Sequence, residues 1–227
     1  MYKRFSTRLV FSGLSAIPAP GTDEIAGTMK GATKGERTAQ RILDAAEVLF
    51  ARKGYEGASL RDIAALAGIH QPGLYNHFAS KEDLYRAVLD RGLQPLVELM
   101  GSLLGARIPP ADMIDLPARM TDLLARHPNI AALLMQSMHS VADAGALIAR
   151  EWLDHLLDHG RRVNEASDLE GDDTALMLRQ IALFNLCCGY FWAEPLVTRL
   201  TGASALSADN LAVQKRMLEQ IMRAFAA

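Results

Sequence analysis

Residues 59–83, SLRDIAALAGIHQPGLYNHFASKED, decide the fold, because they predict two short helices on either side of a glycine. Ser59 stands three residues before Asp62, a capping box that begins the first helix. Gly68 ends that helix at a position where the backbone often needs a positive φ, which glycine adopts without steric cost. A second short helix follows through Leu74. Such a pair of helices predicts a helix-turn-helix, which places its second helix in the major groove of DNA.

A longer helix is predicted directly after this motif. Ser80 and Asp83 form a second capping box at its start, and the apolar positions that follow keep helical spacing as far as Pro95. An interior proline removes one backbone hydrogen bond and bends a helix. Two interpretations therefore stay open: one long helix with a joint at Pro95, or a helix that ends near Gly92 and a new one that begins at Pro95.

Residues 36 to about 92 resemble the DNA-binding domain of the tetracycline-repressor (TetR) family. Two residues depart from the family pattern: His70 stands where a small hydroxyl residue is usual, and Pro72 stands where a small residue is usual. The matching elements are a preceding helix Gln40–Lys53 that ends in Gly54-Tyr55, then Ser59-x-x-Asp62-Ile63-Ala64, Ala67-Gly68-Ile69, Leu74-Tyr75-x-His77-Phe78 and Ser80-Lys81-Glu82-Asp83-Leu84.

The resemblance implies DNA contacts of two kinds. Tyr75, His77 and Lys81 would face phosphates, because tyrosine and lysine reach backbone oxygens and the start of a helix attracts anions. The alternative is that Tyr75 packs inside the domain and Lys81 is an ordinary surface lysine. Gln71, Gly73 and Asn76 would face bases, since amide side chains pair with adenine and glycine permits close approach to a base edge. The alternative for these three positions is a solvated helix face. The candidate DNA-binding residues are Ser59, Arg61, His70, Gln71, Gly73, Tyr75, Asn76, His77 and Lys81.

Composition and charge favour an all-α protein with a DNA-binding head. Half of the 227 residues are hydrophobic and only 6% are aromatic, with helix formers dominant. Residues 1–92 hold 13 Lys and Arg against 10 Asp and Glu, whereas residues 93–227 hold 11 against 16. A mildly basic head on an acidic body fits a protein that reads DNA at one end.

The rest of the chain predicts further helices, separated by glycine and proline. We expect a disordered arm at residues 1–33, a helix-turn-helix DNA-binding domain at 34–92 and a helical ligand-binding and dimerisation domain at 93–227. Met29 is an alternative start of the protein. The helices are expected at about 36–53, from Ser80 to about 95, and at 111–126, 128–140, 143–165, 172–200 and 207–226.

The body is rich in methionine, which suits an adaptable apolar ligand cavity as well as ordinary core packing. Its last two helices carry the apolar stripes expected of a dimer interface. The candidate pocket residues are Met120, Met135, Met138, Trp152, Phe184 and Trp192. The candidate interface residues are Leu183, Phe184, Cys187, Leu211, Leu218, Ile221 and Met222.

Other chemistry has weaker support. His155 and His159 lie one helical turn apart and raise the alternative of a helical metal-binding protein or enzyme, but no metalloprotease motif surrounds them. The adjacent Cys187 and Cys188 read as buried packing in a reduced, cytoplasmic chain rather than as a redox switch. No sequence motif predicts a cofactor or catalysis.

These observations predict a one-component, ligand-responsive transcriptional regulator located in the cytoplasm. We expect a homodimeric repressor that binds a pseudo-palindromic DNA operator and is released by an apolar small molecule. We expect a dimer because one recognition helix contacts too few base pairs for specificity. Two DNA-binding heads about 34–36 Å apart read two half-sites.

Overall fold

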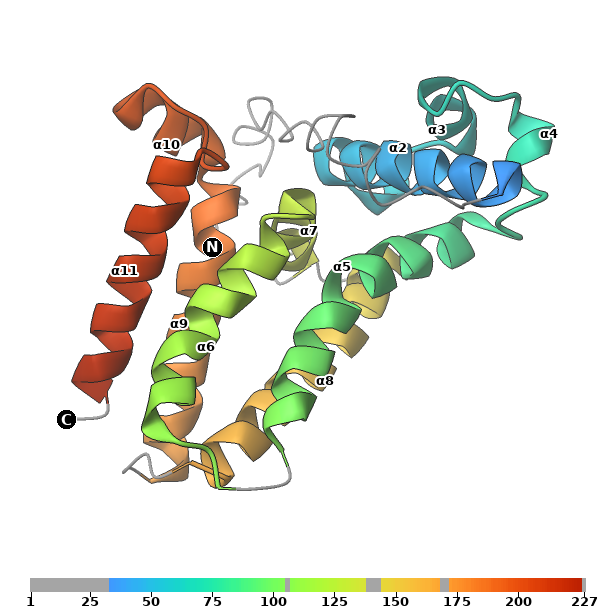
Figure 1. The fold of residues 1–227 in the computed structure, drawn as a ribbon. Coiled ribbons are helices and arrows are strands. Elements are labelled where there is room, and N and C mark those ends of the chain that lie inside the picture. Colours follow the sequence, from blue (N-terminus) through green and yellow to red (C-terminus); the bar gives the residue numbers. More distant parts are fainter. Residues whose placement is uncertain (1–32, 105–106, 138–143, 168–171, 226–227) are drawn as a thin grey trace, which may run out of the picture.

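The computed structural model describes residues 33–104, 107–137, 144–167 and 172–225, and every regular element among them is an α-helix. The all-α prediction is confirmed. Figure 1 shows a small head of three helices beside a larger bundle, with one long helix running between them. The helices are α2 (Lys34–Gly57), α3 (Leu60–Leu66), α4 (Gln71–Leu74), α5 (Lys81–Leu103), α6 (Pro110–Leu124), α7 (Pro128–Ser137), α8 (Ala144–Glu165), α9 (Asp173–Trp192), α10 (Glu194–Thr201) and α11 (Ala208–Phe225).

Helix α2 begins two residues earlier than the sequence indicated, because Thr33 caps it. The Thr33 hydroxyl accepts the Glu36 N–H, and the Glu36 carboxylate accepts the Thr33 N–H in return. Residues 1–32 of the predicted arm lie outside the described residues. At the other end, Gly54 has φ 70° and ψ 172° and breaks the helical conformation, as predicted.

The turn between α3 and α4 is a Schellman motif. Gly68 has a φ of 68°, its N–H donates to the Ala65 carbonyl, and the Ile69 N–H donates to the Ala64 carbonyl. Ile69 is half-buried and packs against the core beneath the turn. The glycine therefore ends α3 and aims the chain directly into α4.

Helix α5 is continuous through Pro95, so the interpretation in which a new helix begins at Pro95 is wrong. Its nearby turns bury Leu93 and Leu96 on both sides of the proline, and this packing holds the helix together across the missing hydrogen bond. The expected domain boundary at residue 92 falls inside α5, so the head and the body share this helix.

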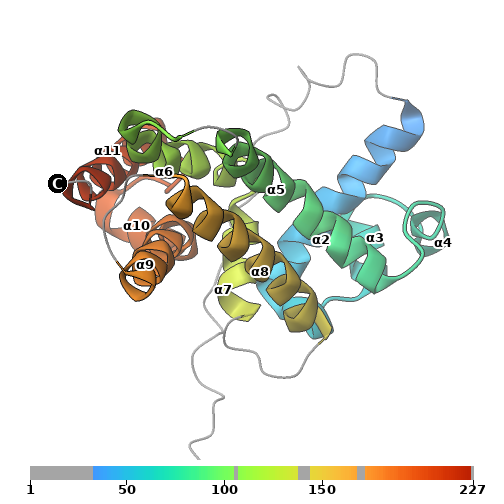
Figure 2. The ribbon, with the colours of Figure 1, turned by 90° about the horizontal axis from the view of Figure 1, so that it is seen from below.

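The body is a bundle in which α5 packs along α8, α7 on α9, and α6 on α11. Figures 1 and 2 both show α5 and α8 side by side, with α9 and α11 at the far end from the head. The single helix predicted at 172–200 is wrong: the chain leaves helical geometry at Ala193, and Pro195 lies in the first turn of α10. For the helix predicted at 128–140, residues 138–140 lie outside the described residues.

A buried polar network attaches the head to the body. Arg91 of α5 donates to Asp44 and Glu47 of α2, each at 2.6 Å, and His127 Nδ1 lies 3.0 Å from the Glu47 carboxylate. Burial alone would raise the pKa of Glu47, but the hydrogen bond from His127 and the charges of Arg91 and His127 lower it overall from its ordinary value of 4.5. The head is thus held to the body through Glu47, which is ionised and exposes only 4% of its surface.

Of the described helices, α9 is long and apolar enough to cross a membrane by length and composition alone. Packing against the bundle accounts for part of the apolar character of α9. Cys187, Cys188 and Phe191 are buried against the bundle, whereas Leu178 and Ile181 face outward.

Candidate functional site

Helix α4 presents a polar face outward from the head. Leu74 and Phe78 hold it in the core, and the opposite side leaves Asn76 and half of Tyr75 exposed. Gln71, Gly73 and His77 lie partly exposed on the same short segment. A Cβ added to Gly73 would meet no atom within 4 Å, so this position is open to a large binding partner.

The predicted caps at the edges of this surface are present. The Ser59 hydroxyl accepts the Asp62 N–H, and the Ser80 hydroxyl accepts the Asp83 N–H, each at 3.0 Å. The Asp83 carboxylate accepts the Ala79 N–H at 3.0 Å. His70 is the N-cap residue of α4, but its side chain makes no capping hydrogen bond and is exposed. The sequence allows His70 either to cap this helix or to contact a phosphate, and the structure contradicts the capping role.

Lys81 is tied to the end of α2. Its Nζ donates to the Glu56 carbonyl at 3.3 Å and lies 4.5 Å from the centre of the Tyr55 ring. Tyr55 in turn packs edge-on against Tyr85 and stacks with Phe50. The lysine is therefore only half-buried but already oriented, at the first residue of α5 where helix N–H groups attract anions.

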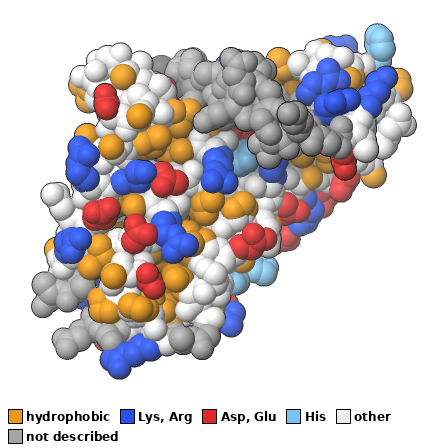
Figure 3. Space-filling model, viewed as in Figure 1, with side chains coloured by type: hydrophobic (Ala, Val, Ile, Leu, Met, Phe, Trp, Pro, Cys, Tyr) orange, Lys and Arg blue, Asp and Glu red, His pale blue; other side chains and the backbone are white. Residues whose placement is uncertain are grey.

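The sequence analysis missed two further cations beside the motif. The Arg41 guanidinium would lie 3.8 Å from a Cβ on Gly68, so Arg41 reaches from α2 over the helix-turn-helix turn. Arg37 is exposed one turn earlier on α2. Figure 3 shows Lys and Arg side chains gathered on the head near α2 and α4. The i, i+4 spacing of Arg37 and Arg41 could have revealed them, but both residues precede the segment 59–83 on which the motif prediction rests.

The profile of the bacterial regulatory proteins of the tetR family matches residues 42–88, which cover most of α2 and all of the helix-turn-helix. This match places the N-terminal domain in the tetR family. The resemblance noted in the sequence is thereby confirmed for this domain, and the exposed face of α4 is the surface that a helix-turn-helix turns toward DNA.

Relatives of this domain include both an activator and a repressor of transcription. The chain is 45% identical over 64 residues to the transcriptional activator FasR of Mycolicibacterium smegmatis, covering 28% of this chain and 29% of FasR. It is 51% identical over 49 residues to the transcriptional repressor ComR of Escherichia coli, covering 22% of this chain and 23% of ComR. The matches thus span less than a third of the length of either relative.

Most of the chain, head and body together, resembles solved transcriptional regulators at the level of the fold. FadR of Bacillus subtilis, solved in complex with stearoyl-CoA, has a TM-score of 0.57 and 17% identity, with 81% of this chain and 96% of that chain covered. At this identity the likeness extends to the arrangement of helices.

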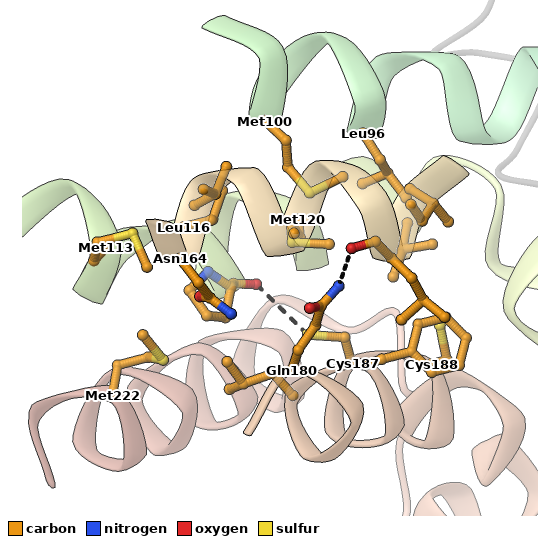
Figure 4. A pocket seen from close by; sticks show the side chains of 18 of the residues that line it. Leu96, Met100, Met113, Leu116, Met120, Asn164, Gln180, Cys187, Cys188 and Met222 are labelled. Carbon is orange, nitrogen blue, oxygen red and sulfur yellow. Dashed lines mark hydrogen bonds between the residues drawn. The ribbon is translucent and has the colours of Figure 1, made fainter. Parts of the chain in front are cut away.

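The body contains a partly open apolar cavity of about 90 Å³. Figure 4 shows four methionines around it, Met100, Met113, Met120 and Met222, with the side chains of Asn164 and Gln180 at its edge. Thioether side chains are flexible, so such a cavity adapts its shape to an occupant. Leu96 and Met100 belong to α5, so the cavity wall is continuous with the helix that carries Lys81.

Two of the six predicted pocket residues, Met120 and Phe184, line this cavity. Trp152 does not, because its indole N–H donates to Asp90 at 3.0 Å on the α5–α8 surface. Trp192 is 39% exposed at the end of α9, and Met135 packs against the core elsewhere. Met138 lies outside the described residues.

Three of the predicted interface residues, Cys187, Leu218 and Met222, are buried within this chain, so these three are corrected to interior positions. Leu183 and Phe184 line the cavity but stay partly exposed. An apolar stripe on an isolated helix does not show which side meets the core of the same chain. Leu211 and Ile221 are partly exposed and stay interface candidates.

Burial explains the two cysteines. It raises the pKa of the Cys187 thiol to about 12 and that of Cys188 well above its ordinary value of 9.0. Both thiols are therefore protonated at neutral pH and pack as small apolar groups.

The alternative of a metal site at His155 and His159 has no ligand set within the described part of the chain, where no three His, Cys, Asp or Glu side chains are grouped to hold a metal ion. His159 Nδ1 instead lies 3.0 Å from the His155 carbonyl oxygen.

Proposed function

We propose that this protein is a one-component transcriptional regulator of the cytoplasm that binds a pseudo-palindromic DNA operator as a homodimer. A small molecule in the cavity releases it from DNA, so it acts as a repressor. The observation that carries the proposal is the solvent-facing polar surface of α4, which the continuous helix α5 links to an apolar cavity in the body.

The DNA-binding surface follows from the exposed groups of the head. Gln71 and Asn76 read base edges, and the open position at Gly73 lets the backbone of α4 approach a base closely. Tyr75, His77 and Lys81 bind phosphates, together with the start of α5. We add Arg37 and Arg41 as phosphate contacts on the far side of the turn. Ser59, Arg61 and His70 lie at the rim of the same surface.

The dimer interface is proposed on the outer faces of α9 and α11. Both helices leave large apolar side chains exposed, and the Gln214 side chain of α11 donates to the Leu186 carbonyl of α9, so the two helices are neighbours. Burying such a surface against a second copy removes it from water. The exposed members are Leu178 and Trp192 on α9 and Val213 and Met217 on α11.

The long helix α5 supplies the connection between effector and DNA. Its first residue is Lys81, and its last turns contribute Leu96 and Met100 to the cavity. A ligand that prefers one orientation of α5 shifts the population of head positions by its differential affinity. Pro95 lies between the two ends and makes the helix easiest to bend there.

The test of the function is selection of binding sites from random duplex DNA by the full chain. We expect an inverted repeat, bound by a dimer as measured by sedimentation. Recovery of no enriched sequence, or binding of one copy to a single half-site, would contradict the proposal.

Gly73→Ala separates DNA contact from folding. Because a Cβ at Gly73 meets nothing within 4 Å, the free energy of unfolding is expected to stay the same or rise by up to about 1 kcal/mol. Operator affinity is expected to fall by roughly tenfold or more, since the methyl group lies where a base edge approaches. Gly101→Ala, equally unobstructed but in the body half of α5, is the control and should leave operator affinity unchanged.

Lys81→Ala is expected to weaken binding to all DNA sequences by a similar factor and to reduce the slope of log affinity against log salt by about one unit per head. Loss of the contact with the Tyr55 ring should also lower stability by about 0.5–1 kcal/mol. Lys215→Ala on α11 removes a paired lysine far from the head and serves as the control. An unchanged salt slope for Lys81→Ala would assign Lys81 a structural role only.

A further inference from the structure

Two hollows meet between α8 and α9. The inner one is the apolar cavity of about 90 Å³, and the outer one is a surface groove of about 500 Å³. Leu157, Asn164 and Gln180 line both. These three shared residues form the boundary between the two hollows, which is called the passage below.

Gln180 closes this passage. Its Nε2 donates to the Leu157 carbonyl at 2.7 Å, which draws the side chain of α9 across to α8. Gly160 provides the space, because a Cβ there would lie 2.2 Å from Gln180 Nε2 and 2.7 Å from Gln180 Cδ. Figure 4 shows the Gln180 amide pointing across the edge of the cavity. Opening the passage breaks this one hydrogen bond.

The outer groove is lined mainly by apolar atoms, but unlike the cavity it also carries charged side chains. Its charged lining residues are Asp158, Glu165 and Asp173 against Arg161, an excess of two negative charges. Arg161 donates to Asp158 at 2.9 Å and also to Glu165, so its charge is already matched by carboxylates of its own helix. The groove therefore favours a positive group over a negative one.

We propose that the passage admits a cationic amphiphile with a single alkyl chain. The tail displaces the Gln180 amide from its notch over Gly160 and enters the methionine-lined cavity, and the positive head stays in the groove near Glu165 and Asp173. This inference rests on the proposed function only in treating the cavity as the effector site. Gln180 is then a specificity-determining gate: a short or branched molecule does not gain enough apolar contact to open it.

Calorimetric titration of the full chain without DNA tests the proposal. The probes are decyltrimethylammonium and decyl sulfate, which share a chain length and differ in the sign of the head, both well below the concentration at which they form micelles. We expect the cation to bind at least tenfold more tightly. The double variant Glu165→Gln with Asp173→Asn should remove most of that preference, whereas Glu98→Gln with Asp115→Asn, which neutralises exposed carboxylates outside the groove, should preserve it.

Two further variants test the path. Cys187→Phe fills the inner cavity and should weaken binding of the cation at least tenfold, with the melting temperature checked to show that it folds. Gln180→Ala should speed association several-fold in stopped-flow mixing while the preference for the cation is kept.

Equal binding of the two probes, no binding of the cation, or a folded Cys187→Phe variant with unchanged affinity would overturn the inference. The groove variants alter surface residues only, so their result stands even if Cys187→Phe fails to fold. Because no DNA is present, the outcome is independent of the operator selection: binding of the cation by a protein that selects no operator would support the ligand site and refute the regulatory function.

Discussion

Glu47→Ala is expected to lower the free energy of unfolding by about 3–5 kcal/mol, because it removes one partner of a buried ion pair and leaves the other charge behind. Arg91 would keep only Asp44, and its Nε is already buried without a hydrogen-bond partner among the described atoms. Chemical denaturation measures the loss. The control is Glu98→Ala on the exposed side of α5, which should change stability by no more than about 0.5 kcal/mol.

Glu47→Gln adds a test of charge at constant shape. The pKa of Glu47 is lowered in the folded protein, so its contribution to stability is complete above the ordinary value of 4.5 and is lost as the pH falls through the lower, folded value. The stability difference between the wild type and Glu47→Gln should therefore be constant near neutral pH and shrink below about pH 4.5. A difference that grew with acidification would show that this carboxylate is not ionised in the folded protein.

Gly92→Ala is expected to lower stability by about 1–3 kcal/mol, against the usual benefit of alanine in a helix. Its Cβ would lie 2.4 Å from Ile130 Cγ1 and 3.3 Å from Ile130 Cβ, and Ile130 is fully buried in α7. The substitution therefore pushes α5 away from α7 near the junction of head and body. We also expect the effector concentration that releases DNA to change.

Gly101→Ala is the matched control in the same helix. Nothing lies within 4 Å of its Cβ, so it should raise stability by about 0.5–1 kcal/mol. Ile130→Ala should largely suppress the cost of Gly92→Ala in a double-mutant cycle, because the two side chains contact each other directly. Additive effects of the two substitutions would mean that the strain arises elsewhere.

The head could be predicted from sequence because the interactions that form it are local. Ser59 with Asp62 and Ser80 with Asp83 are three residues apart, and the positive φ of Gly68 follows from a helix end within the same segment. Thr33 with Glu36 has the same spacing but lies before the apolar pattern that drew attention to the first helix.

The cavity and the dimer interface of the body were harder to predict. An apolar stripe shows that one face of a helix is apolar, but it does not show what covers that face. Cys187 and Leu218 carry the pattern of an interface, yet both are buried within the bundle of one chain. Met120 and Phe184 were correctly predicted to line the cavity, because methionine and aromatic residues suit one. The same reasoning gave a wrong prediction for Trp152, whose indole N–H donates to Asp90 outside the cavity.

The sequence by itself determined the all-helical fold, the helix-turn-helix and the outward polar face of α4, since these depend on propensities, caps and one glycine turn within residues 59–83. Only the tertiary structure decided the junction and the gate. Glu47 meets Arg91 and His127 from 44 and 80 residues away, and Gln180 rests on Leu157 and Gly160 of another helix. Contacts at such separations depend on how helices cross, and no local pattern encodes that geometry.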